Sequence, residues 1–195
     1  MPKSDRTVTE ILAAARQTME FARLGQEDFL AGGQRRLAGL HTAITNARSV
    51  TFVLQGLLNK LPDAASWYAE SQATLKDDPI CKWFVELRNK IEKQGSLGQP
   101  SRTVDFLHVG PAFYAAQPPG TVSTFIGDEL GRSGHVVRLA DGSETRIYVQ
   151  LPPEMAQVSI YLDGAPNDLP IEDLLGYYLT RIEGVLVDAE RRFGA

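Results

Sequence analysis

Apolar residues recur at helical spacing along the first part of the chain. Thr7 and Glu10 form a Thr-x-x-Glu capping box, which satisfies free amide groups where a helix begins. Apolar residues then follow in steps of three and four, which predicts a helix that ends at Gly25. These residues are Val8, Ile11, Leu12, Ala15, Met19 and Ala22.

A second apolar stripe predicts a longer helix from about Gln34 to Leu61, closed by Pro62. Because Val50 and Phe52 lie beside the main stripe, the helix is expected to make contacts on more than one side. Such a helix belongs at the centre of a bundle or at a dimer seam. The main stripe consists of Leu37, Leu40, Ile44, Ala47, Thr51, Leu54, Leu58 and Leu61.

Two aspartates predict the starts of further helices. Asp63 is expected to cap a short helix that carries Trp67 and Tyr68. Asp78-Pro79 is a second start, with Asp as the N-cap and Pro in the first helical position. Gly95 predicts the end of that helix. Its buried stripe is expected to contain Ile80, Trp83, Phe84, Leu87 and Ile91.

After a loop expected at residues 95–102, the period changes to that of strands. Asp141-Gly142 predicts a two-residue hairpin, and Asp163-Gly164 predicts the end of the last strand. Alternation predicts that Ile147, Val149 and Leu151 line a buried face, as do Val158, Ile160 and Leu162. The expected strands cover residues 104–109, 121–126, 136–139, 145–151 and 158–162.

A final helix is expected from about Leu169 to Phe193, long enough to pack along the early helices. The predicted fold class is therefore α+β: a mainly α-helical bundle with an inserted antiparallel sheet of three to five strands. Residues 1–195 are expected to form one domain. The bundle takes residues 7–95 and 168–194, and the β-rich insertion takes residues 103–163.

Composition narrows the class of protein. Apolar residues make up 43% of the 195 residues, which suffices for a sizeable core. The net charge of −4 argues against a broadly basic surface for nucleic acid. Cys81 is the only cysteine, so no internal disulfide can form, and no apolar run has the length of a membrane span. We expect a cytoplasmic protein with no membrane partner.

Few residues in the sequence have the type and spacing expected of a metal site or a catalytic site. His41, His108 and His135 lack metal-ligand spacing, so neither a metal site nor a cofactor is expected. Cys81 is expected to be a small core residue. The acidic pairs Asp128-Glu129 and Glu172-Asp173 fall at element ends, where solvated charges are ordinary.

The segment Trp83 to Gly95 carries the best candidate site. On a helical wheel Arg88 falls at the edge of the buried face, whereas Asn89 points nearly opposite the core. Arg88 and Glu92 are four residues apart and can pair along the helix. We take Arg88, Asn89 and Lys93 as candidate binding residues.

The string Leu87-Arg88-Asn89, near the end of a helix that closes with Gly95, resembles the Arg-Asn signature of HEPN-type helical domains. The resemblance implies a compact bundle, usually dimeric, of the kind found in toxin–antitoxin systems and in nucleotide-binding accessory domains. The ribonuclease members carry an Arg, then four to six residues, then a His, but the permitted positions in this chain hold Lys93, Gln94 and Gly95. The segment from Ala47 to Gly95 is also similar to uncharacterised bacterial proteins with an Arg-Asn-x-Ile-x-Lys-x-Gly pattern.

Three functional hypotheses stay open, and the sequence does not decide whether the protein is an enzyme. The first is a non-catalytic HEPN-like domain, a homodimer that binds a protein, nucleotide or RNA partner. The second is a toxin ribonuclease in which Lys93 or His41 replaces the missing base. The third is a small-ligand binding protein or enzyme with a pocket between sheet and bundle, lined by Phe113, Tyr114 and Tyr148.

Overall fold

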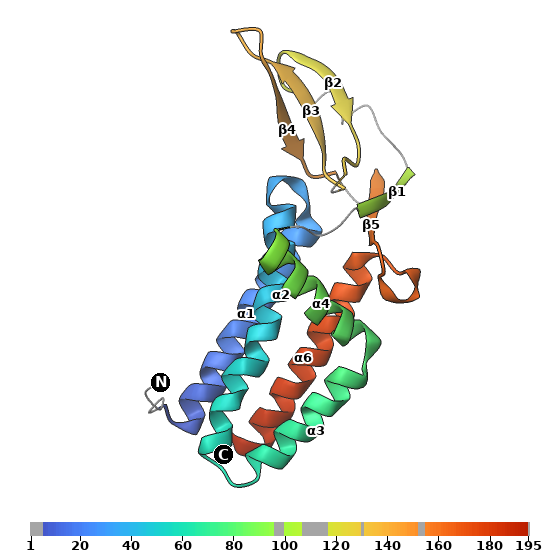
Figure 1. The fold of residues 1–195 in the computed structure, drawn as a ribbon. Coiled ribbons are helices and arrows are strands. Elements are labelled where there is room, and N and C mark those ends of the chain that lie inside the picture. Colours follow the sequence, from blue (N-terminus) through green and yellow to red (C-terminus); the bar gives the residue numbers. More distant parts are fainter. Residues whose placement is uncertain (1–5, 96–99, 107–116, 130, 152–154, 195) are drawn as a thin grey trace.

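Five long helices and five strands make up the described part of the chain (Figure 1). The structure is a computed structural model, and it describes residues 6–95, 100–106, 117–129, 131–151 and 155–194. The long helices are α1 (Val8–Ala31), α2 (Arg36–Leu54), α3 (Ala64–Asp77), α4 (Pro79–Gln94) and α6 (Ile171–Phe193). Three short 3-10 helices are η1 (Gly33–Arg35), η2 (Gln55–Asn59) and η3 (Pro166–Asp168). The strands are β1 (Pro100–Phe106), β2 (Thr121–Phe125), β3 (Ser133–Arg138), β4 (Glu144–Val149) and β5 (Ala156–Leu162).

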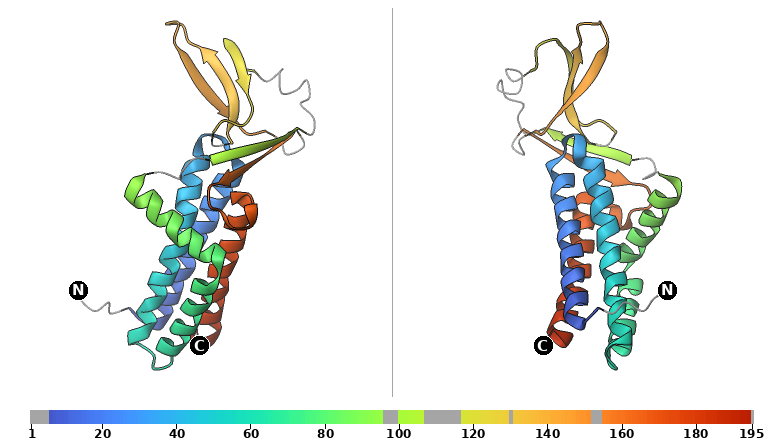
Figure 2. Two further views of the ribbon diagram at one scale, coloured as in Figure 1. Left: turned by 45° about the vertical axis from the view of Figure 1, so that its right-hand side comes forward. Right: turned by 90° about the vertical axis from the view of Figure 1, so that its left-hand side faces the viewer.

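The helices form a bundle, and the strands lie at one end of it (Figures 1 and 2). Helix α1 begins and α6 ends at the opposite end of the bundle from the strands (Figure 1). The arrangement confirms the predicted fold class, α+β with a mainly helical bundle. No helix among the described residues is long and apolar enough to cross a membrane.

Helix α1 does not end at Gly25, as the sequence suggested, but continues to Ala31 and stops at Gly32. A Cβ atom on Gly25 would lie 2.5 Å from the backbone nitrogen of Ala43, and one on Gly39 would lie 2.5 Å from that of Phe29. Both glycines therefore allow α1 and α2 to approach closely. Gly25, which the sequence analysis took as the end of the helix, is instead a point of close contact between two helices of the bundle.

Two of the three predicted helix N-caps, at Thr7 and Asp78, are present in the structure. Thr7 and Glu10 form the reciprocal capping box, with the Thr7 amide donating to Glu10 Oε2 at 2.7 Å. Asp78 Oδ1 accepts hydrogen bonds from two amides at the start of α4, and Gly95 ends that helix in the left-handed conformation. Asp63 stands at the start of α3, but its side chain makes no cap hydrogen bond.

The core runs along the inner faces of the helices. The stacked rings of Phe84 and Tyr178 join α4 to α6, with centroids 4.5 Å apart. Leu37 and Phe52, predicted to belong to the apolar stripe of α2 or to flank it, are instead 41% and 47% exposed. Outside the core, an ion-pair network joins α1 to α6 through Arg16, Arg23, Glu183 and Glu190.

The strands form two sheets rather than the single predicted one. Strands β1 and β5 pair antiparallel from Pro100↔Leu162 to Phe106↔Ala156. Strands β2, β3 and β4 form a separate antiparallel sheet in that order. The three-stranded sheet extends beyond the end of the bundle, and β1 and β5 cross that end (Figure 2). The first strand starts at Pro100, inside the predicted loop, and residues 107–109 of the predicted strand lie outside the described residues.

The hairpin between β3 and β4 differs from the two-residue prediction. Leu139 and Ser143 are joined by a backbone hydrogen bond of 2.8 Å, so three residues form the loop. Gly142 takes a φ of 84°, which a three-residue loop with a left-handed last residue requires. Within the loop, Asp141 Oδ1 accepts a hydrogen bond from the backbone amide of Ser143 at 3.0 Å.

Burial of the strands also departs from the alternation. Ile147 is 39% exposed and Val149 is half-buried, so the face that the alternation predicted to be buried is not enclosed on β4. The buried residues of the three-stranded sheet lie on its central strand β3, where Val137 and His135 are enclosed. By contrast Ile160 and Leu162 of β5 are buried as predicted, because β5 packs on α6.

Candidate functional site

The predicted site residues lie in the last turns of α4. Arg88 Nη2 pairs with Glu92 Oε1 at 2.7 Å, and Arg88 Nη1 donates to Asn89 Oδ1 at 3.3 Å. Asn89 is half-buried, and Lys93 is exposed. The structure thus brings Arg88 and Asn89 together, but neither they nor Lys93 line the two cavities described below.

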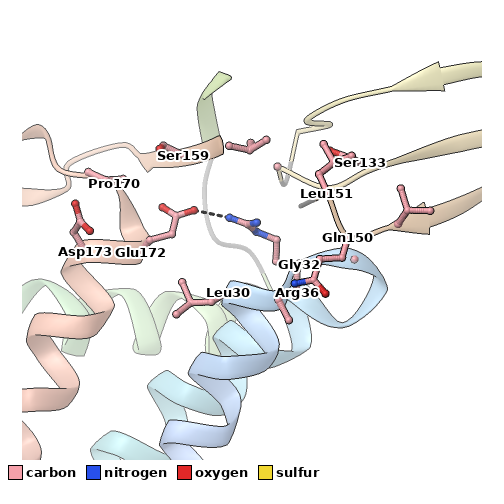
Figure 3. A pocket seen from close by; sticks show the side chains of 15 residues that line it. Leu30, Gly32, Arg36, Ser133, Gln150, Leu151, Ser159, Pro170, Glu172 and Asp173 are labelled. Atoms are coloured by element: carbon pink, nitrogen blue, oxygen red, sulfur yellow. Dashed lines mark hydrogen bonds and ion pairs between the residues drawn. The ribbon is translucent and has the colours of Figure 1, made fainter. Parts of the chain in front are cut away.

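A cavity of about 410 Å³ lies where the strands meet the bundle (Figure 3). We call it the junction cavity. Its walls come from the end of α1 with η1, the start of α2, strands β3 and β5, the segment after β4, and the start of α6. Side chains around it include Leu30, Arg36, Ser133, Gln150, Leu151, Ser159, Pro170, Glu172 and Asp173 (Figure 3).

Arg36 and Glu172 form the charged centre of the junction cavity. Arg36 Nη2 lies 2.5 Å from Glu172 Oε1, and the two side chains are only 8% and 17% exposed. The Arg36 guanidinium also stacks over the Phe29 ring, 4.7 Å from its centroid. In Figure 3 the guanidinium points from α2 into the cavity and toward Glu172. The pair therefore links the start of α2 to the start of α6 across the cavity.

The electrostatics of this pair reflect its burial. Burial lowers the pKa of Arg36, while the nearby carboxylate of Glu172 opposes that shift. Burial likewise raises the pKa of Glu172, while Arg36 and the amide of Ile160 oppose that shift. Removing both charged groups from water costs free energy, and only their ion pair and further hydrogen bonds of good geometry can offset that cost.

One donor of this centre has no partner. Arg36 Nε is buried and makes no hydrogen bond to any described residue. A buried N–H without an acceptor costs about 1–3 kcal/mol. The unmet donor lies on a side chain that lines the cavity. A ligand whose acceptor atom reached Nε would satisfy it.

Local structure fixes these positions. The chain turns from α1 into α2 through Gly32 and Gly33, whose φ values of 76° and 63° favour glycine. This turn places Arg36 in the first turn of α2, on its buried side. Glu172 lies in the first turn of α6 and accepts from the amide of Ile160 at 3.3 Å, which ties it to β5.

The sequence-based reading of the acidic pairs as solvated charges was wrong at two positions. Glu172 is largely buried, and Asp128 is only 9% exposed in an ion pair with Arg132 at 2.7 Å. Arg36 was not singled out at all. One signal in the sequence could have identified it. Arg36 shares the buried side of α2 with Leu40 and Ala43, and charged side chains are almost never buried unless they are paired.

Of the aromatic residues expected in such a pocket, Tyr148 lies in the described structure and does not line the junction cavity. Tyr148 instead stacks with the Arg132 guanidinium, 4.3 Å from its ring centroid, and packs against Phe125. Phe113 and Tyr114 lie outside the described residues.

The two histidines in the described part of the chain lie on different elements. His41 is exposed on α2, His135 is buried in β3 with Nδ1 at 3.1 Å from Thr124 Oγ1, and His108 lies outside the described residues. Within the described ranges no group of three His, Cys, Asp or Glu side chains is placed to hold a metal ion.

Comparison with known proteins gives one family. Residues 33–124 match the family model described as bacteriophage lambda protein ea47. The match begins at η1 and spans α2, α3, α4, β1 and nearly all of β2, so it includes Arg36 and the Arg88-Asn89 pair but not α6. The chain is similar to this family over slightly less than half its length. No curated protein and no solved structure matches the chain.

Proposed function

We propose that the protein binds a small polar ligand in the junction cavity. One observation carries this proposal: the guanidinium of Arg36 is buried against the cavity, and its Nε donor has no partner among the described residues. Sites of this kind combine an enclosed, partly apolar wall with a few fixed polar groups. Leu30, Leu151 and Val158 supply apolar wall here.

The chemistry of the cavity defines the ligand class. Arg36 offers an N–H donor, while the carboxylate oxygens of Glu172 can accept further hydrogen bonds beyond the two they make. A molecule with an acceptor atom beside an N–H or O–H donor would use both. An amide, an amino acid or the edge of a nucleobase presents that arrangement. Since the two charges already neutralise each other, a neutral or zwitterionic ligand suits the site best.

The Arg36 side chain itself provides the test. The Nε–H group of an arginine gives its own signal in a ¹⁵N-correlated NMR spectrum, so a panel of amides, amino acids and nucleosides can be titrated against it. We expect at least one class to shift the Arg36 signal with saturable binding. Arg36→Lys keeps the charge but loses the Nε donor, so it should weaken binding about tenfold or more.

The neighbouring Arg35 is the matched control. Arg35 is 77% exposed and pairs with Asp28, so Arg35→Lys should leave ligand binding unchanged. A panel without any ligand that moves the Arg36 signal would overturn the proposal, as would an Arg36→Lys variant that binds as well as the native chain.

The HEPN-like interaction function is a second candidate. One observation favours it: Arg88 is bound to Asn89 at the end of α4, and its buried Nε has no partner among the described residues. In this hypothesis the protein acts in the cytoplasm as a homodimer with a protein, nucleotide or RNA partner. Light scattering at micromolar concentration should then give a dimer mass that Arg88→Glu lowers and Lys90→Glu does not. A monomer in all three samples would remove this candidate.

The toxin ribonuclease is the catalytic form of the same hypothesis. Its test is incubation of RNA with the native chain and with Arg88→Ala. Cleavage that disappears in the variant would support it, and equal cleavage or none would exclude it.

A further inference from the structure

A second cavity, of about 270 Å³, lies inside the helical bundle between α2, α3, α4 and α6. We call it the bundle cavity. Its walls are largely apolar, and Leu75, Val85, Ile182 and Val185 supply much of the surface. For comparison, an apolar cavity of about 150 Å³ suffices to bind benzene. The bundle cavity therefore has room for an aromatic ring or a short alkyl chain.

The inner end of the bundle cavity is formed by groups that stay neutral. Tyr178 is 1% exposed and stacks on Phe84, and burial raises its pKa. Burial also raises the pKa of Cys81 to about 12, so its thiol keeps its proton at neutral pH. This end of the cavity offers a low-dielectric contact surface for hydrocarbon, not for charge.

The hydroxyls of Tyr68 and Thr51 in the wall already have hydrogen-bond partners. The Tyr68 hydroxyl donates to the carbonyl of Thr51 at 3.1 Å and accepts from Gln55 and Gln72. The Thr51 hydroxyl donates to the carbonyl of Arg48 at 2.9 Å. A ligand body in the cavity consequently gains most by being apolar.

The rim of the bundle cavity is positive. Its charged lining residues are Arg48, Lys76 and Lys82, and none of the lining residues is acidic. Arg48 is half-buried over the Phe52 ring at 4.5 Å and donates to Thr51, but it has no ion pair with a described residue. Lys76 and Lys82 likewise have no ion-pair partner among the described residues. Three cations thus surround an apolar cavity without a counter-ion in the described chain.

We propose that the bundle cavity binds a small amphipathic carboxylate. The hydrocarbon part lies against Leu75, Val85 and Ile182, and the carboxylate meets Arg48 and the two lysines at the rim. Charge complementarity selects the anion, and burial of apolar surface supplies affinity. This site is separate from the junction cavity and does not depend on the function proposed there.

Three ligands with the same alkyl chain test the proposal: octanoate, 1-octanol and octylammonium. Each is titrated into the native chain, with binding followed by NMR shifts of the Val85 and Val185 methyl groups. We expect octanoate to bind most tightly, octanol about tenfold more weakly, and octylammonium least, since rim cations repel it. Equal binding of octanol and octanoate, or no binding of octanoate at millimolar concentration, would overturn the proposal.

Variants add an independent check. Arg48→Gln and Lys82→Gln should each weaken octanoate binding several-fold and leave octanol binding unchanged, whereas Lys60→Gln, outside the cavity, should alter neither. Octanol binding to each variant also shows that its cavity is intact. If the rim variants bind octanoate as the native chain does, the cations do not recognise the carboxylate and the proposal fails.

Discussion

Gly25 and Gly39 lie against each other across the α1–α2 interface. A Cβ atom on Gly25 would come within 2.8 Å of the carbonyl oxygen of Gly39, and one on Gly39 within 2.7 Å of the carbonyl oxygen of Gly25. Backbone atoms cannot move aside as flexible side chains do. The distance between α1 and α2 is therefore set by the absence of side chains at Gly25 and Gly39.

Substitution of either glycine should destabilise the bundle. Gly25→Ala or Gly39→Ala forces α1 and α2 apart, and we expect a loss of about 1–3 kcal/mol or more in the free energy of unfolding. Urea denaturation measures the loss. Gly184 of α6 is the control, because nothing lies within 4 Å of a Cβ atom there, so Gly184→Ala should stabilise by about 0.5–1 kcal/mol. Similar values for all three variants would contradict the packing argument.

Asp78 should contribute to stability in a pH-dependent way. Burial acts to raise its pKa, but the amides of Cys81 and Ile80 and the hydroxyl of Tyr177 outweigh burial and lower it. A lowered pKa means that the stabilisation is complete above about pH 4 and is lost as the pH falls through the folded-state value.

Asp78→Ala should cost about 1–2 kcal/mol at pH 7, the usual loss for a helix cap, and less at pH 3. Thermal unfolding at both pH values measures the difference. Asp63→Ala, which removes a side chain that caps nothing, should cost little at either pH. An equal loss from the two variants would refute the cap assignment.

The Arg36–Glu172 pair should show strong thermodynamic coupling. Arg36→Met leaves the Glu172 carboxylate buried without its partner, and we expect a loss of about 3–5 kcal/mol. The double variant Arg36→Met/Glu172→Gln removes both charges and should lose less than the sum of the single variants. Arg35→Met, at an exposed pair, should cost less than about 1 kcal/mol. Additive losses in the double-mutant cycle would mean that the pair is not coupled.

Cys81 should react slowly in the folded protein. Because burial raises its pKa to about 12, the reactive thiolate is rare at pH 8. We expect iodoacetamide to alkylate the native thiol more than a hundredfold more slowly than the thiol of the chain unfolded in urea, where the pKa is about 8.5. Mass spectrometry over time gives both rates. Native and unfolded rates within tenfold of each other would show that the thiol is accessible and ionised.

Elements marked by local signals were predictable from the sequence. The capping box at Thr7, the cap at Asp78 and the glycine stop at Gly95 act within a few residues of themselves, and the structure has all three. Gly25 led to a wrong prediction of the end of α1. Its role is to contact α2, and the neighbouring sequence does not reveal which helix packs there. The exposed Ile147 misled for a related reason: alternation shows which side chains share a face, but not whether another element covers it.

The candidate site was harder to predict than the fold. Arg36 and Glu172 are 136 positions apart and meet only because α1 turns into α2 at one end of the bundle while α6 begins there. Spacing rules identify site residues that lie close together in the sequence, on one helix or in one loop. They cannot identify two residues that are far apart in the sequence and meet only in the fold. The region between sheet and bundle was anticipated as a place for a pocket, but its residues were not.

The pairing of β1 with β5 has a consequence for how related chains can differ. The chain leaves the bundle along one of these strands and returns along the other, so the whole stretch from Phe106 to Ala156 is closed by a two-stranded stem. Changes in length beyond the stem alter one wall of the junction cavity while the entry and exit points stay fixed. The β1–β5 stem thus fixes the two points at which the outer strands join the bundle, whatever their length.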